Sequence, residues 1–289
     1  MVTAGDPAPP AAVHVDLDGA RQIFAAHGWR YDAADDPLFA SGLEGALAAL
    51  REARIVATLF VVAEDVEDPA KRSLLRRAVE QGHEIASHSR THRRLTALAR
   101  DEKRREIAGS REALRSALGV EVDGFRAPGF RIDRECLELV AEAGYAYDSS
   151  LLAGRSSRRA LPHRPCAGRT LVELPLPTRA PFRLPFHPSY ALVLGDAYFA
   201  RGVDGWRARA LPFVLLFHLT DFAAPLPRAR LGGWRRRLFT LSHLSAADKR
   251  ARCRAMLRRV SERFEIVPTA RLLASAARER DAGAAGESS

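Results

Sequence analysis

Short β-like runs alternate with helical patterns along most of this chain, and this alternation limits its possible folds more than any other feature. The predicted strands are residues 13–18, 57–64, 83–89, 124–129, 145–150, 170–176, 212–219 and 264–269. The predicted helices are residues 41–54, 68–81, 100–118, 131–143, 245–262 and 269–278. Such alternation is typical of parallel strands joined by crossover helices. Seven or eight strands in one domain favour an α/β barrel over an open sheet.

The two ends of the chain differ in composition from this alternating region. Residues 1–12 are rich in Pro, Ala and Gly, and residues 279–289 are small and polar, so we expect both to be tails. Between them, residues 13–278 form one predicted domain, and an apolar fraction of 47% supports a core of ordinary size. Residues 151–211 are rich in Arg and Pro, which predicts long irregular loops over the site.

Reactive side chains follow several predicted strands, where a parallel barrel gathers its chemistry. In V-H-V-D-L-D-G, Asp16 and Asp18 are two residues apart at the end of the first strand, so both carboxylates point to one side. Two carboxylates this close repel each other unless a cation or a proton lies between them. The polar face of an edge strand, followed by a turn, would give the same pattern.

The motif H-S-R-T-H follows the third predicted strand. On one helical turn, the i, i+4 spacing of His88 and His92 would put both imidazoles on one face, close enough to share a metal ion. Two imidazoles and one carboxylate suit Zn²⁺ or a similar divalent ion, and they leave a position open for water. A pair of surface histidines in a turn is the alternative interpretation.

Two more strand ends carry cationic groups. Arg126 begins the segment R-A-P-G, in which Pro128 is rigid and Gly129 is flexible, and its guanidinium would keep a neighbouring carboxylate ionised. His218 ends the apolar run P-F-V-L-L-F-H, where an imidazole can donate a proton to a leaving amine. Taken singly, a basic loop residue and a structural histidine explain these positions equally well.

A fifth motif, Y-D-S-S at residues 147–150, contains Asp148, which either orients a catalytic group or caps a turn. In this order, D-x-D-G, H-S-x-x-H, R-x-P-G, Y-D-S-S and L-x-F-H resemble the motifs of the polysaccharide deacetylase family, also called the NodB-homology family of carbohydrate esterase type. The resemblance runs from about Val13 to His218. It implies a distorted (β/α)7 barrel in a single domain, and a hydrolase that removes an N- or O-acetyl group from a sugar.

The resemblance also implies roles for the motif residues. The implied ligands of a divalent metal are Asp18, His88 and His92. The ion would be Zn²⁺, with Co²⁺ or Ni²⁺ as alternatives. Asp16 would be the catalytic base and His218 the acid, and Arg126 would brace Asp16. The expected substrate-binding residues are Pro128, Gly129, Tyr147, Asp148, Ser149 and Leu215.

Two contacts with the reacting group are expected as well. A backbone N–H near the turn at residues 147–150 would hold the oxyanion, and the apolar segment Leu215–Phe217 would form a small pocket for the acyl methyl group.

The motifs depart from the family's commoner pattern in two places. Leu17 separates the two aspartates, which are adjacent in the more frequent T-F-D-D-G. The spaced form resembles branches that act on lipid-linked sugars, exopolysaccharides or non-sugar amides. The family's fourth motif often has a second Asp and a Trp, whereas two leucines follow Ser150 in this chain. Asp148 and Asp221 are therefore both candidates for the residue that tunes His218.

Charge and cysteine content exclude some partners and cofactors. The formal net charge is +10, but Arg is spread along the chain and no nucleic-acid-binding motif occurs, so no nucleic-acid partner is expected. The three separated cysteines indicate neither a disulfide framework nor a thiolate metal site. No apolar run approaches the ~20 residues of a transmembrane helix, and residues 1–12 lack a secretory pattern. We therefore expect a cytoplasmic protein.

The expected substrate is an acetylated amino sugar, as a lipid-linked or other intracellular conjugate. Residues 181–194 and Gly233–Leu241 combine apolar, aromatic and cationic side chains, which suits peripheral contact with the inner membrane surface. Packing of these loops on the barrel is the alternative. The competing activity is an amidase acting on a cyclic imide, a formamide or a ureide, and the competing class is a catalytically silent module that binds glycans or membranes.

Overall fold

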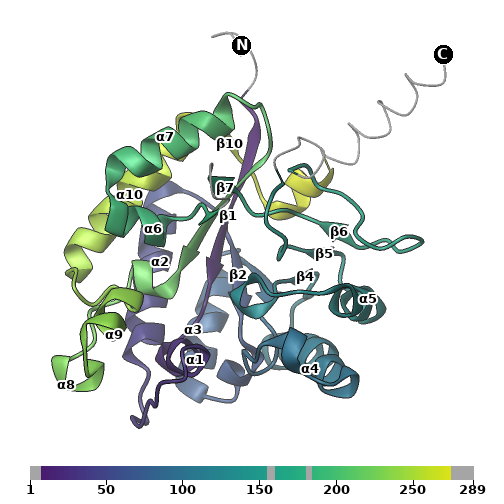
Figure 1. Cartoon of the computed structure of the whole chain (residues 1–289), viewed down its shortest axis with the longest axis horizontal. Helices are drawn as coiled ribbons and strands as arrows, with labels where there is room; N and C mark the ends of the chain where they lie inside the picture. The colour runs from purple at the N-terminus through teal and green to yellow at the C-terminus, as the bar shows by residue number, and fades with distance from the viewer. Residues whose placement is uncertain (1–7, 155–159, 180–183, 275–289) are drawn as a thin grey trace.

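The computed structural model describes residues 8–154, 160–179 and 184–274. Its main sheet is entirely parallel and curls into a barrel with helices on the outside (Figure 1). From one edge to the other, the strands are β6 (Val172–Glu173), β5 (Tyr147–Asp148), β4 (Gly124–Phe125), β3 (Glu84–Ser87), β2 (Thr58–Val61), β1 (Pro10–Asp16) and β9 (Phe213–His218). An eighth strand, β10 (Glu265–Ile266), pairs with the first residues of β1. Within the described ranges no pairing joins β6 to β9, so the barrel is open there.

The predicted barrel fold is confirmed, and each of the eight predicted strands overlaps an observed one. Strand β1 begins at Pro10, three residues earlier than predicted and within the predicted N-terminal tail. The observed strands are mostly shorter than predicted. For example, β4 pairs with β5 over only Gly124 and Phe125, after which the chain turns into the 3-10 helix η3 (Pro128–Phe130). The residues that leave the ladder in this way form the loops at the carboxyl end of the barrel.

Five predicted helices are confirmed, with boundaries that differ by a few residues. They are α2 (Pro37–Ala53), α3 (Pro69–Glu80), α4 (Arg100–Leu118), α5 (Arg134–Glu142) and α10 (Ala246–Ser261). The sixth predicted helix is helical over residues 269–274, and its predicted residues 275–278 lie outside the described residues. Helix α2 begins earlier than predicted because the Asp36 side chain accepts the Phe39 N–H and Pro37 occupies the first turn.

Several elements were not predicted. The helices among them are α1 (Ala20–Ala26), α6 (Pro188–Leu194), α7 (Asp196–Arg207), α8 (Arg228–Leu231) and α9 (Trp234–Phe239). The others are a short antiparallel pair, β7 (Thr178–Arg179) with β8 (Leu184–Pro185), and the 3-10 helices η1 (Ala63–Val66), η2 (Leu95–Ala97) and η5 (Leu219–Asp221). The expectation of irregular structure across residues 151–211 is therefore wrong for α6 and α7. Pro188, which suggested a loop, lies in the first turn of α6, where proline is tolerated.

Strand β1 separates the two layers of the core. Val13 and Val15 pack in the main apolar core, which also contains Phe39 of α2. His14 and Asp16 belong to the opposite face, which points into the barrel. No helix within the described ranges combines the length and apolar character of a membrane span. The alternation along β1 thus places polar side chains inside the barrel, where they need partners.

One glycine inside the barrel gives a test of this packing. A Cβ at Gly124 would overlap the ring of Tyr147, whereas a Cβ at Gly109 on α4 would meet only the Arg90 guanidinium, at an ordinary 3.5 Å. We expect Gly124→Ala to lower the free energy of unfolding by about 1–3 kcal/mol through overpacking. Gly109→Ala should raise it by about 0.5–1 kcal/mol, because alanine favours a helix interior. Urea denaturation of both variants measures these changes. Equal effects of the two substitutions on the free energy of unfolding would contradict the close packing of Gly124 against Tyr147.

Candidate metal and catalytic site

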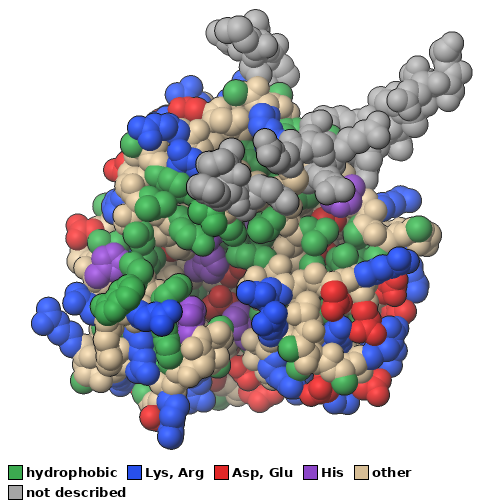
Figure 2. All heavy atoms as spheres, in the orientation of Figure 1, with side chains coloured by type: hydrophobic (Ala, Val, Ile, Leu, Met, Phe, Trp, Pro, Cys, Tyr) green, Lys and Arg blue, Asp and Glu red, His purple; other side chains and the backbone are tan. Residues whose placement is uncertain are grey.

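The carboxyl ends of β1, β3, β4 and β9 meet at one end of the barrel and bring the predicted motifs together. On this face, histidine and acidic side chains surround a hollow (Figure 2). The residues gathered there are Asp16, Asp18, His88, His92, Arg126 and His218. Asp16 and His218, 202 positions apart in the sequence, thus become neighbours because parallel strands all end at the same edge.

Asp18, His88 and His92 form a compact cluster. The Oδ1 atom of Asp18 lies 3.2 Å from Nε2 of His88 and 3.3 Å from Nε2 of His92. The candidate ligand atoms all lie within 4.8 Å of one another, and the two imidazole centroids are 5.0 Å apart. The three side chains therefore converge on one point from the ends of β1 and β3, which flank β2 in the sheet.

The loop between the two histidines is not the helical turn that their spacing suggests. Ser89 and His92 both have positive φ values, 65° and 59°, and no helix is assigned from His88 to His92. The carboxylate of Glu106, on α4, accepts the N–H groups of Arg90 and Thr91 and so holds this loop. The two imidazoles converge through a tight loop, and Glu106 is a supporting residue that the sequence analysis missed.

The donor set of this cluster fits a divalent cation. Within the described residues, Asp18 Oδ1 and both ring nitrogens of His92 are buried without a hydrogen-bond partner. The ring of His88 is oriented by its Nδ1, which lies 2.8 Å from the Arg126 carbonyl oxygen and donates to it, so Nε2 keeps its lone pair. Burial raises the pKa of the Asp18 carboxyl, but His92 and His88 outweigh this and hold that pKa well below its usual range. An ionised carboxylate and two imidazole nitrogens are ordinary ligands of Zn²⁺.

Asp16 is held by a buried cation and faces the cluster. Its Oδ1 accepts a hydrogen bond of 2.6 Å from Nη1 of Arg126, and both side chains are shielded from solvent. Its Oδ2 lies 4.0 Å from His88 Nε2 and 3.9 Å from His218 Nε2. One carboxylate oxygen is therefore anchored while the other faces the reactive side of the site.

The Y-D-S-S motif lies behind Arg126. The Ser149 carbonyl oxygen and hydroxyl accept two hydrogen bonds from the Arg126 guanidinium, each 2.8 Å long. Asp148 accepts the Ser150 N–H and hydroxyl, and the Ser150 oxygen accepts the N–H of Ala127. These side chains are buried. The predicted substrate contacts of Asp148 and Ser149 are therefore replaced by contacts that position Arg126 and the segment after it.

The predicted oxyanion contact near this turn is also corrected. The N–H groups of Tyr147, Ser149, Ser150 and Leu151 all donate hydrogen bonds within the fold. Tyr147 is buried, and its hydroxyl donates to Glu84, away from the site. By contrast, Gly129 is exposed, and no hydrogen bond from its N–H occurs within the described residues.

Register removes Leu215 and Phe217 from the predicted acyl pocket and leaves Leu216 on the inner face. His218, Leu216 and Val214 share the inner face of β9, whereas Leu215 and Phe217 pack in the outer core. Pro128 is buried at the start of η3. Among the predicted substrate-binding residues, Gly129 is thus the one with an exposed position beside the site.

His218 has two partners that the sequence analysis missed. Its Nδ1 lies 3.2 Å from the Ser189 hydroxyl, and its ring centroid lies 4.9 Å from that of His187. Asp221 accepts the backbone N–H of His218 at 2.9 Å and does not bond its ring. Asp148 instead bonds Ser150. Only the fold places α6, and with it Ser189, beside β9.

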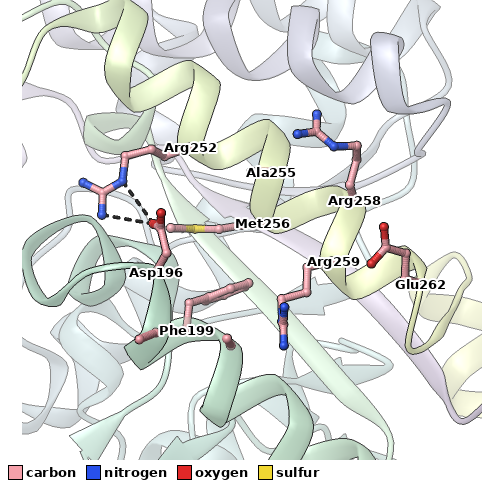
Figure 3. Close-up of a pocket in the computed structure, with 10 residues that line it drawn as sticks. Asp196, Phe199, Arg252, Ala255, Met256, Arg258, Arg259 and Glu262 are labelled. Carbon is pink, nitrogen blue, oxygen red and sulfur yellow. Dashed lines mark hydrogen bonds and ion pairs between the residues drawn. The ribbon is translucent and has the colours of Figure 1, made fainter.

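A separate groove lies away from this site. It has a volume of about 430 Å³ and runs between α7 and α10 on the outside of the barrel (Figure 3). Phe199 and Met256 line it, and Arg252 is paired there with Asp196 at 3.2 Å. None of the site residues described above lines this groove.

The segment that carries several of these site residues is similar to a known protein family. Residues 26–147 match the family described as Polysaccharide deacetylase. This region contains His88, His92 and Arg126, and it lies between the aspartate motif and His218. This segment thus resembles the polysaccharide deacetylases, and the resemblance predicted from the motifs is confirmed.

A curated relative has a similar segment. A chitooligosaccharide deacetylase of Sinorhizobium fredii (strain NBRC 101917 / NGR234) is 34% identical over 117 residues, which cover 40% of this chain. The chain spans about half the length of that relative, 52%.

Solved structures show the same fold. A structure from Mycobacterium smegmatis assigned as a polysaccharide deacetylase has a TM-score of 0.68 at 20% identity, with coverage of 96% of this chain and 94% of that one. The allantoinase Puue has a TM-score of 0.63 at 14% identity, with 93% coverage of both chains. At these identities the likeness concerns the fold alone.

A chain of hydrogen bonds runs from the site into the barrel. The His14 ring accepts from Arg126 Nη2 at Nδ1 (2.8 Å) and donates from Nε2 to Thr269 (3.0 Å). Thr269 contacts the Thr58 hydroxyl, which donates to Glu84. Because a guanidinium can only donate, His14 must be neutral, and burial together with Arg126 holds its pKa well below the usual value.

This buried neutral histidine predicts a pH dependence of stability. Below about pH 6.5 the unfolded chain protonates His14 but the folded chain does not, so stability is present above that pH and falls as pH is lowered. His14→Asn keeps an acceptor for Arg126 and removes the titration. We expect the free energy of unfolding of the metal-free chain, measured by urea denaturation, to fall less steeply from pH 7 to pH 5 in this variant, by up to about 1.4 kcal/mol per pH unit. His243→Asn, at an exposed position, should follow the parent, and parallel curves for His14→Asn and the parent would contradict the assignment.

Proposed function

We propose that this chain is a metal-dependent hydrolase that removes an N-acetyl, or another N- or O-acyl, group from an amino sugar. The observation that carries the proposal is the placement of Asp16 between the Asp18–His88–His92 cluster and His218, with its Oδ2 4.0 Å from His88 and 3.9 Å from His218. A candidate base, a candidate acid and a candidate metal cluster share one hollow. The relation to the polysaccharide deacetylases supports this reaction class.

A divalent ion in the cluster, most simply Zn²⁺, would polarise the acyl carbonyl and lower the pKa of water. Asp16 is suited to take the proton from the attacking water, because Arg126 anchors its Oδ1 and leaves Oδ2 facing the site. His218 is suited to protonate the leaving nitrogen through Nε2, since Ser189 orients its other ring nitrogen. The exposed N–H of Gly129 is the candidate backbone donor to the developing oxyanion.

The proposed substrate is a small acetylated amino-sugar conjugate, carried on a lipid or free. The spaced aspartate motif and the exposed aromatic and cationic side chains near the site support this choice over an external polymer. The alternative is an amidase acting on a cyclic imide, a formamide or a ureide. The fold likeness to an allantoinase is compatible with this alternative. Acetate release from N-acetylhexosamine conjugates, with no turnover of cyclic amides, would favour the deacetylase.

Two substitutions distinguish the role of a metal ligand from the role of the base. We expect His92→Ala to lose bound zinc and activity together, because it removes one of three ligands. Asp16→Asn should keep the zinc and lose about 10²–10⁴-fold in kcat, because the amide cannot accept the proton. Elemental analysis and acetate release measure both quantities. His243→Ala, exposed and outside the cluster, is the control, and near-normal turnover by Asp16→Asn would overturn the assignment of the base.

The assignment of the acid is tested by the leaving group. An amine needs a proton to leave, whereas an activated phenolate does not, so His218→Gln should reduce amide hydrolysis far more than hydrolysis of an activated aryl ester. We expect a difference of about 10²-fold or more between the two substrates. Equal losses of activity on both substrates would show that His218 does not act as the general acid.

A further inference from the structure

Exposed large hydrophobic side chains are concentrated beside the site. Among the described residues they are Val56, Leu184, Tyr190, Val193, Leu194, Trp234 and Phe239. Six of these seven lie on α6, on α9 or on β8 just before α6. Val56 lies just before β2, at the amino ends of the strands and so at the opposite end of the barrel. In Figure 2 hydrophobic side chains gather on the face that carries the hollow with the histidines.

Helix α9 lies on the surface and exposes aromatic and cationic side chains together. It reads W-R-R-R-L-F, and none of its residues is buried. Trp234 is 71% exposed and Phe239 is 47% exposed. We call Trp234, Arg235, Arg236, Arg237 and Phe239 the aromatic–arginine patch. Large aromatic side chains left in water beside three cations indicate a binding surface.

The charge of this patch is uncompensated within the described residues. None of Arg235, Arg236 and Arg237 forms an ion pair with a carboxylate there. Arg236 lies over the rings of Phe24 and Trp29, with its Cζ 5.4 and 5.6 Å from their centroids. The partner of this surface must therefore be anionic, and a second copy of the same patch would meet it with like charge.

The patch lies close to the candidate metal cluster. Helix α1 begins two residues after Asp18, and its seven residues span roughly 10 Å. At its far end, His27 contacts Phe239, with ring centroids 4.4 Å apart. Helix α6 also borders the site, because it carries Ser189 against His218, and it ends with the exposed Val193 and Leu194. Two exposed apolar surfaces thus lie near the site.

We propose that this face docks on an anionic phospholipid bilayer, with the aromatic–arginine patch at the level of the headgroups. Tryptophan and arginine suit that position, because their apolar parts enter the interface while the indole N–H and the guanidinium reach water and phosphate. Leu184, Tyr190, Val193 and Leu194 form the second contact. In so far as the proposed deacetylase function holds, this orientation presents the site to an acetylated amino sugar on a lipid carrier.

Co-sedimentation of the full chain with vesicles tests the docking without any substrate. We expect binding to vesicles of phosphatidylcholine mixed with phosphatidylglycerol, little binding to phosphatidylcholine alone, and release by salt. Trp234→Ser/Phe239→Ser should weaken binding at least tenfold. Arg235→Gln/Arg237→Gln should weaken it about fivefold for each arginine removed. Arg236 is left in place because it packs on Phe24 and Trp29.

Matched controls come from the opposite end of the barrel. Val56→Ser removes a hydrophobic side chain that is 41% exposed. Arg51→Gln/Arg258→Gln removes two exposed arginines that have no ion pair within the described residues. Both controls should bind vesicles as the parent does, and circular dichroism of each variant checks its folding.

The outcomes separate docking from the proposed function. Absence of binding to the anionic vesicles, or equal weakening by the patch variants and the controls, overturns the docking proposal. Self-association lost in Trp234→Ser/Phe239→Ser without any vesicle binding also overturns it, in favour of a second copy. Acetate release from a water-soluble substrate is measured independently, so docking can fail while the deacetylase function stands, and the reverse.

Discussion

Arg126 and Asp16 form an ion pair of 2.6 Å at the centre of the barrel, and both side chains are almost completely buried. Removing two charges from water costs several kcal/mol per ion unless hydrogen bonds compensate for the lost hydration. Arg126 has that compensation, because it donates to Asp16, to His14 and twice to Ser149, and its Cζ lies 3.9 Å from the Phe60 ring centroid. The surrounding strands must supply these acceptors, which explains why polar residues occur inside an otherwise apolar barrel.

The motifs around the site follow from this requirement. Ser149 supplies acceptors to Arg126, Ser150 fixes the backbone just after it, and Asp148 fixes Ser150. Glu173 lies beside Asp148, where burial and the Asp148 carboxylate raise the Glu173 pKa well above its usual value. A protonated Glu173 can share its proton with Asp148, so two buried carboxyl groups coexist. The Y-D-S-S motif thus acts through Arg126 on the position of Asp16.

Much of this arrangement can be predicted from sequence because it depends on strand periodicity. Asp16 and Asp18 share a side because they are two residues apart. The histidine motif follows β3, which lies next but one to β1 and ends at the same edge of the barrel. The same rule, applied backwards from His218, places Leu216 inside and Leu215 outside. The expected acyl pocket at Leu215 therefore conflicted with a periodicity that the sequence already contained.

Other parts of the site depend on contacts that local patterns do not encode. The positive φ values of Ser89 and His92 are supported by Glu106, which lies on a helix whose sequence shows only an amphipathic outer face. His187 and Ser189 reach His218 because α6 packs beside β9, and their own segment resembles a proline-rich loop. In each case the supporting residue comes from an element with no fixed sequence distance to the motif.

Asp18 and Asp16 occupy adjacent positions in the site but are held by different means. The chain between them leaves the strand through Leu17, whose N–H still pairs with the Phe60 carbonyl oxygen. At Gly19 the backbone approaches Asp36 so closely that a Cβ would overlap its carboxylate. Asp36 accepts the Ala20 N–H and pairs with Lys71 at 2.9 Å, so this loop is tied to α2 and α3.

This difference separates the two carboxylates chemically. Asp16 has a permanent cation, since Arg126 cannot deprotonate in a protein, and one of its oxygens is always engaged. Asp18 has no such partner within the described residues and faces only His88 and His92, whose charge depends on protons. A carboxylate with that environment is stabilised best by an exchangeable cation. The spaced aspartates therefore give one position suited to proton transfer and one suited to a metal, and Leu17 sets the distance between them.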